Sequence, residues 1–326
     1  MLAYLLRRLL HAVLVLLAMS VLVFAGVYLI GNPVDVLIDP QATQAEAAHA
    51  AASLGLDRPL PVQYWHFLTQ ALTGNFGRSF VSGTGAMQLV LHRMPATLEL
   101  AVVASLISLV VGVPLGLRAG RKPGSLVARL ITASSVIGYS LPTFWLGVLL
   151  VTLFSVQLGW LPPAGRGAVV EVFGIPLSVF TLDGWRHLIM PAFNLALFQL
   201  ALMIRLVSTG TQDAYGRDYV RFARAKGVPE GRIARMHVLR NIALPVVTVA
   251  GLELGSVIAF AIVTETIFSW PGMGKLLIDS IEMLDRPVIV AYLLVVVCVF
   301  VLINLLVDIL YTALDPRVRL AGATGA

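Results

Sequence analysis

The chain has 326 residues, of which 58% are hydrophobic and 12% are charged, and its formal net charge is +6. Because an ordinary soluble domain carries roughly 25% charged residues, this composition excludes a water-soluble domain and indicates an integral membrane protein. A nucleic-acid-binding protein is also excluded, since the basic residues flank apolar runs and form no stripe interleaved with exposed aromatics. The single cysteine, Cys298, rules out an internal disulfide and a cysteine-based metal cluster.

Six apolar runs predict membrane-spanning helices, each close to the about 20 residues that a bilayer core requires. They cover residues 9–30, 98–117, 130–156, 188–206, 242–267 and 288–310. The first follows Arg7 and Arg8, as in a secretory signal. It is too long for a signal core and no small-x-small cleavage site directly follows it, so we expect an uncleaved helix. The expected fold class is therefore an all-α integral membrane protein with six transmembrane helices.

The distribution of Lys and Arg predicts the orientation of these helices. Residues 1–8, 118–129, 205–240 and 312–326 hold 16 of the 23 Lys and Arg residues, and an even number of spans places all four segments on one side. Cytoplasmic loops carry the excess of positive charge, so both termini are expected in the cytoplasm. The outer segments would be 31–97, which includes a short helix at 41–52, then 157–187 and 268–287.

Small residues four positions apart predict close contacts between spans. Gly112 and Gly116 have this spacing in one span, and Gly251 and Gly255 have it in another.

The cytoplasmic segment 205–245 is longer and more basic than a connection between two spans needs. Helical spacing predicts a short amphipathic helix at 215–226. Its basic face comprises Arg217, Arg221 and Arg224, and its apolar face comprises Tyr219, Phe222 and Ala223. Gly227 provides a helix stop. Pro229 and Glu230 suit the first turn of a second helix that runs toward Leu239, before Pro245 opens the next span. Such a helical knob fits either a groove on another protein or an anionic lipid surface.

Residues 219–228 (YVRFARAKGV) and 237–245 (HVLRNIALP) resemble the coupling loop of the dipeptide, oligopeptide and nickel permease family of ABC importers. The resemblance extends over nearly the whole chain. It includes YLLRR at 4–8, LGLDRP at 54–59, MPATLEL at 94–100, LGWLP at 158–162, SWPGMG at 269–274 and LDPRV at 314–318. One departure is that the general importer motif begins Glu-Ala-Ala, where this chain has Arg221, Phe222 and Ala223.

The resemblance implies the type I ABC importer permease fold, with one extra N-terminal helix and a five-helix core. Residues 1–93 would form the first helix and a periplasmic segment. Residues 94–312 would form the transmembrane domain with its coupling loop at 207–240, and 313–326 a cytoplasmic tail. The residues that would couple to the ATPase are Tyr219, Arg221, Phe222, Ala223, Arg224, Ala225, Lys226 and Gly227.

The implied partners are a second homologous permease, two cytoplasmic ATPase subunits and a periplasmic or lipid-anchored solute-binding protein. All would assemble in the lipid of the bacterial inner membrane, without nucleic acid. The cargo would be a di- or oligopeptide, with a nickel chelate or glutathione as alternatives within the family.

No phosphate-binding loop of the form Gly-x-x-x-x-Gly-Lys-Ser/Thr occurs in the sequence. We therefore expect no catalytic site, cofactor or metal on this chain, with ATP and Mg²⁺ on the partner ATPase subunits. Ionisable groups within spans are functional candidates by default, so the candidates for the translocation pathway are Glu253 and Glu265, with Asn194 as a polar companion. The competing hypotheses are an ion-coupled carrier that acts alone and a membrane scaffold that transports nothing.

Overall fold

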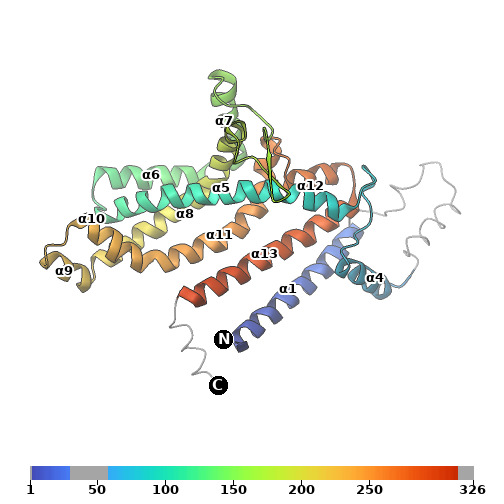
Figure 1. Cartoon of the computed structure of the whole chain (residues 1–326), viewed down its shortest axis with the longest axis horizontal. Helices are drawn as coiled ribbons and strands as arrows, with labels where there is room; N and C mark the ends of the chain where they lie inside the picture. Colours follow the sequence, from blue (N-terminus) through green and yellow to red (C-terminus); the bar gives the residue numbers. More distant parts are fainter. Residues whose placement is uncertain (1, 30–57, 315–326) are drawn as a thin grey trace. The chain divides into compact units, whose positions relative to one another are not determined.

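The computed structural model describes residues 2–29 and 58–314, and Figure 1 labels its helices and strands. The expected helix at 41–52 and the tail residues 315–326 lie outside the described residues. Within the described part, five helices are long and apolar enough to cross a membrane. A bent pair of helices adds a sixth crossing if it is counted as one span. The chain divides into two compact units, residues 1–95 with 272–301, and residues 96–271 with 302–326.

The first unit joins the N-terminal helix to the segment around residue 285. It contains α1 (Leu2–Leu29), α4 (Leu60–Leu72), α12 (Met273–Glu282) and the first part of α13 (Arg286–Leu314). In α1, the ring of Phe24 lies 5.4 Å from that of Tyr64 in α4. The buried carboxylate of Asp285 accepts hydrogen bonds from the Ser79 hydroxyl and, at 3.1 Å, from the Phe80 backbone N–H. These bonds attach the loop after α4 to the start of α13.

The second unit is a helical bundle with a small β-hairpin. Its elements are the main part of α5 (Ala86–Arg121), α6 (Leu126–Ser140), α7 (Thr143–Leu150), η1 (Val151–Gln157), β1 (Val170–Val172), β2 (Ile175–Leu177), α8 (Leu182–Tyr215), α9 (Asp218–Ala225), α10 (Glu230–Arg232), η2 (Ile233–Val238), α11 (Leu239–Ile267) and the end of α13. At the turn of the hairpin, Phe173 (φ 53°) and Gly174 (φ 77°) both have positive φ, as a two-residue type I′ turn requires. This hairpin is absent from the elements expected from the sequence.

Glycines allow α5 and α8 to pack closely. A Cβ atom on Gly112 would lie 3.1 Å from the Met203 Cβ, and one on Gly116 would lie 2.6 Å from the Val207 Cβ. One turn further, a Cβ on Gly120 would collide with the backbone carbonyl of Ser208. The predicted helix contact at Gly112 and Gly116 is confirmed. Gly251 fits the same rule, because a Cβ there would collide with Val307 of α13.

The predicted continuous helix at 130–156 is wrong. The helix α6 begins after Ser125, whose hydroxyl caps it by accepting from the Ala128 N–H at 3.1 Å, and it ends at Ser140. The next helix, α7, starts at Thr143, and the two are bent by 103°. The cause is Pro142, which has no N–H to continue the helix and which favours an extended conformation at Leu141 (ψ 130°).

The predicted boundary at Pro245 is also wrong. The elements α10, η2 and α11 follow one another without a gap, and Pro245 lies inside α11. The apolar crossing therefore belongs to a 38-residue helical run, Glu230–Ile267. At about 1.5 Å per residue, such a run is far longer than the roughly 30 Å of bilayer hydrocarbon. The helices α5 and α8, with 36 and 34 residues, are similarly long. Each of these three helices consequently extends beyond the membrane core.

The close contact between α5 and α8 predicts that Gly116→Val destabilises the protein. The added methyl groups would meet Val207, and overpacking of this kind costs about 1–3 kcal/mol. We expect a lower melting temperature in detergent, measured by fluorescence-detected size-exclusion chromatography. The matched control is Gly26→Val in α1, where a Cβ has no atom within 4 Å. Equal melting temperatures for the two variants would contradict the packing argument.

Candidate functional site

The helical knob, defined here as residues 216–238, packs against the rest of the chain through one side of α9. Val220 and Ala223 are buried there, together with Ile233 and Val238 of η2 and Ala214 of α8. The predicted apolar face was partly wrong, because Ala223 faces inward whereas Phe222 is 62% exposed. Adjacent helical residues differ by about 100° in direction, so the face defined by Val220 and Ala223 turns Phe222 outward.

The exposed side of α9 combines aromatic and cationic groups. The Lys226 Nζ atom lies 4.5 Å from the centre of the Phe222 ring, and the neighbouring Arg221 is exposed. The Tyr219 hydroxyl accepts a hydrogen bond from the Asn241 amide at 2.7 Å, which fixes this ring beside the start of α11. The exposed side of α9 therefore presents the large apolar side chain of Phe222 beside Lys226 and beside Arg221, which pairs with Asp218 at 3.5 Å, and such a surface is suited to a groove on a protein partner.

The C-terminal end of α9 is held by a sharp turn and an ion pair. Gly227 has φ +73° and donates its N–H to the Arg224 carbonyl at 2.9 Å, so the predicted helix stop is confirmed. Arg224 turns back toward the protein, and its Nε donates to the Glu230 carboxylate at 2.7 Å. That hydrogen bond is the main cause of a raised pKa for Arg224. Arg224 thus has a different role from the outward-facing Arg221.

Two of the three pathway candidates lie close together. The Asn194 amide donates to the Thr264 hydroxyl at 3.1 Å. Glu265, the residue after Thr264, accepts a hydrogen bond from the Thr97 hydroxyl at 2.6 Å. These four side chains are at most 1% exposed. Glu253 is half-buried and lies twelve residues earlier in α11, about 18 Å away along the helix axis. Asn194 and Glu265 therefore tie α8 and α5 to α11, whereas Glu253 is separate.

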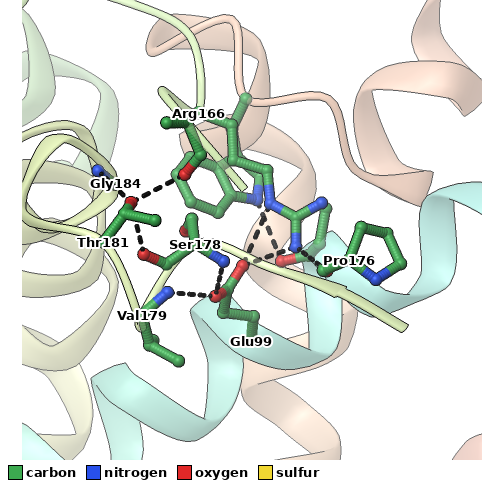
Figure 2. Close-up of polar contacts among 10 residues, drawn as sticks. Glu99, Arg166, Pro176, Ser178, Val179, Thr181 and Gly184 are labelled. Atoms are coloured by element: carbon green, nitrogen blue, oxygen red, sulfur yellow. Dashed lines mark hydrogen bonds and ion pairs between the residues drawn. The ribbon is translucent and has the colours of Figure 1, made fainter. Parts of the chain in front are cut away.

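A buried ion pair connects α5 to the segment 166–179, which is expected on the outer side of the membrane, and Figure 2 shows its hydrogen bonds. The Glu99 carboxylate accepts from Arg166 Nη2 at 2.6 Å and Nε at 3.0 Å. It also accepts from the backbone N–H groups of Ser178 (2.6 Å) and Val179 (2.8 Å). The Arg166 guanidinium donates further to the Pro176 carbonyl at 2.6 Å. The exposed fractions of the Glu99 and Arg166 side chains are only 2% and 11%.

We call this group of residues, Glu99, Arg166, Pro176, Ser178 and Val179, the outer clamp. The guanidinium of Arg166 also lies 5.7 Å from the ring centre of Trp270, whose Nε1 donates to the Ala96 carbonyl. The outer clamp thus fixes the hairpin to α5 and to the chain just after α11. Sequence reasoning did not single out Glu99 or Arg166. The available signal was Glu99 within the family-like MPATLEL segment.

Two surface grooves lie apart from the candidate pathway residues. One surface groove follows α6 between Pro123 and Ile137, and another follows α7 and η1 between Trp145 and Gln157. Neither groove is lined by Asn194, Glu253 or Glu265. Among the described residues, no three His, Cys, Asp or Glu side chains gather closely enough to hold a metal ion. The candidate features of the described residues are thus the exposed side of the knob and the buried polar contacts of Asn194, Glu265 and the outer clamp.

Comparisons with known proteins agree with this geometry. The family model "binding-protein-dependent transport system inner membrane component" matches residues 112–320, and the model of its N-terminal part matches residues 1–101. The glutathione transport system permease protein of Salmonella typhimurium is 39% identical, covering 98% of this chain and 99% of its own length. The oligopeptide transport system permease protein of Bacillus subtilis is 38% identical, covering 98% and 100%. The dipeptide transport system permease protein of Escherichia coli is also 38% identical, covering 98% and 99%.

Among solved structures, a chain of the MetNI methionine ABC transporter in inward-facing form has a similar fold. The TM-score is 0.53 at 17% sequence identity, and the match covers 70% of this chain and 97% of that chain. This similarity confirms the expected type of fold, a helical importer permease.

The outer clamp predicts a strong effect of Glu99→Gln. The substitution removes the charge that pairs with Arg166 and leaves the guanidinium buried, and breaking a buried pair costs about 3–5 kcal/mol. We expect faster hydrogen exchange in residues 165–180, measured by mass spectrometry, and a lower melting temperature. Glu171→Gln, on the exposed strand β1 of the same hairpin, is the control and should exchange like the unmodified protein. Unchanged exchange in Glu99→Gln would show that the pair does not hold the hairpin.

Proposed function

Because this chain belongs to the family of inner membrane components of binding-protein-dependent transport systems, we propose that it forms half of a translocation pathway for peptides. Three of its relatives are named as permeases for glutathione, oligopeptides and dipeptides. Glutathione is itself a tripeptide, so a short peptide is the chemistry that these names share. The cargo proposed for this chain is accordingly a small peptide.

The energy for uptake is proposed to come from ATPase subunits that bind the helical knob from the cytoplasm. The observation that carries this proposal is the exposed Phe222, surrounded by Arg221 and Lys226, on a helix whose opposite side is anchored by Val220 and Ala223. An exposed aromatic residue on a firmly held helix is suited to a pocket on a partner. In this assignment, the basic segments and both termini face the cytoplasm. Tyr219, Ala225 and Gly227 shape the same surface.

A second, homologous permease is proposed to complete the pathway. Of the 15 residues of α6, Ala128 and Ile131 are buried, and Leu126, Leu130 and Ile137 are at least 60% exposed. A helix so little covered by its own chain has surface available for another subunit as well as for lipid. On the outer side, the hairpin held by the outer clamp is proposed to meet the solute-binding protein.

Within the membrane, we assign different roles to the three pathway candidates. Asn194 and Glu265 are engaged in buried hydrogen bonds near the outer end of the bundle, where they would stabilise the closed outer gate. Glu253 is half-buried and lies at mid-helix, so it is the residue proposed to line the pathway.

Reconstitution in liposomes tests the proposed function directly. The chain is assembled with a candidate partner permease, ATPase subunits and solute-binding protein, and uptake of a labelled peptide mixture is measured with and without internal ATP. We expect uptake only with ATP and with all subunits present. Uptake by the purified chain alone under a proton gradient, abolished by Glu253→Gln, would instead establish an ion-coupled carrier. Absence of flux in every combination would favour a scaffold.

The docking role of the knob predicts that Phe222→Ser releases the ATPase. Loss of one anchoring aromatic residue at an interface costs about 2 kcal/mol or more, which corresponds to roughly 30-fold weaker binding. Less ATPase should therefore copurify with the membrane complex. Because Phe222 is exposed, the melting temperature of the isolated chain should not change. The control is Phe180→Ser in the outer segment, where the ring is 64% exposed, and the ATPase should remain bound. Equal ATPase recovery in both variants would argue against the knob as the docking site.

A further inference from the structure

Glu230 lies where several cytoplasmic elements meet. It is the first residue of α10, directly before η2 and α11. One carboxylate oxygen, Oε1, accepts from Arg224 Nε of α9 at 2.7 Å. The other, Oε2, lies 3.9 Å from Arg121 Nε at the end of α5. The guanidinium of Arg224 in turn lies 5.2 Å from the ring centre of Tyr215, the last residue of α8. One carboxylate therefore joins the ends of α5, α9 and α10, and through Arg224 it reaches α8.

Stability alone does not account for this arrangement. The side chains of Arg121, Arg224 and Glu230 are 36–47% exposed, and exposed ion pairs contribute only about 0–1 kcal/mol each. The hydrophobic contacts of Val220 and Ala223 already hold α9 against η2. The Glu230 carboxylate adds a polar connection between α9 and α5, on the other side of the Gly227 turn. The hydrophobic cluster under α9 makes its own contact with α5 through Leu117. The ion-pair bridge is a second connection between α9 and α5.

The helix α5 is well suited to carry a displacement further. It continues without interruption from Ala86 to Arg121. Its glycines lock against Met203, Val207 and Ser208 of α8, so the two helices have little freedom to slide separately. Further along the same helix, 22 residues before Arg121, α5 carries Glu99 and with it the outer clamp. A movement of α5 at Arg121 would therefore be transmitted along the rigid helix to the outer clamp.

We infer that Glu230 is a positioning residue that makes the helical knob and α5 move together. When the ATPase displaces α9, the Arg224–Glu230–Arg121 bridge transfers the displacement to α5 as well as to α11. This inference rests on the proposed function, since it assumes that the ATPase acts on the knob. It assigns the bridge a role in converting ATP hydrolysis into transport, distinct from ATPase binding at Phe222.

The test compares single charge removals in the complete reconstituted complex. Glu230→Gln and Arg121→Gln disconnect the bridge from its two sides, and Asp213→Asn removes an exposed carboxylate nearby in α8 as a control. The measured quantities are copurified ATPase, ATP hydrolysis stimulated by the loaded binding protein, and peptide molecules transported per ATP. We expect unchanged ATPase recovery in all three variants. We expect peptide transported per ATP to fall at least threefold in Glu230→Gln and in Arg121→Gln, and to stay unchanged in Asp213→Asn.

Peptide transported per ATP is informative because a purely structural defect lowers the amount of complex and leaves this ratio unchanged. If both bridge variants keep the ratio of the unmodified complex, the inference is overturned while the proposed function stands. If the unmodified complex shows no ATP-dependent uptake, the proposed function itself fails. Should Glu230→Gln not assemble, Arg121→Gln decides alone, because Arg121 lies on the other side of the bridge and leaves the Arg224–Glu230 pair intact.

Discussion

Helices α5 and α8 approach each other so closely that a side chain would collide at Gly116 and Gly120 and would be tightly squeezed at Gly112. Inside a bilayer no hydrophobic effect drives helices together, so van der Waals contact over a long smooth face has to supply the association. Gly112, Gly116 and Gly120 provide that face, and Met203, Val207 and Ser208 fill it. The contact involves α5, a long apolar helix, and both candidate functional regions are attached to it. Glu99 in α5 carries the clamp, and Arg121 at the C-terminal end of α5 reaches the knob.

Much of this architecture follows from composition and spacing. Long apolar runs predict transmembrane helices, because few other structures can satisfy their backbone hydrogen bonds within a bilayer. The four-residue spacing of Gly112 and Gly116 predicted a helix contact that the structure contains. The prolines show where such reasoning ends. Pro191 and Pro245 lie inside continuous helices, whereas Pro142 ends one and redirects the chain by 103°. Nothing local in the sequence separates these cases, since neighbouring helices decide whether the freed backbone groups are satisfied in place.

The functional residues divide in the same way. The knob was predictable because its helix, its glycine stop and its family-like sequence are all local. The side of α9 that faces inward was not predictable, because Val220 and Ala223 are buried by contacts with Ile233 and Val238, which follow the Gly227 turn. The pair of Glu99 and Arg166 was beyond reach for a further reason. The two residues are separated by 67 positions, and only the folded chain brings them within hydrogen-bonding distance. The separation of Glu253 from Asn194 and Glu265 likewise depends on the fold.

The elbow at Pro142 restricts what can surround the bent pair of α6 and α7 if that pair crosses the bilayer. The last carbonyls of α6 and the first amides of α7 have no next turn to receive their hydrogen bonds. Acyl chains offer neither donors nor acceptors, and each backbone N–H or C=O group left without a hydrogen bond in the hydrocarbon costs several kcal/mol. The elbow is therefore incompatible with contact with fatty-acid tails. It has to border water or polar groups of protein, so this side of the subunit is turned away from the lipid tails.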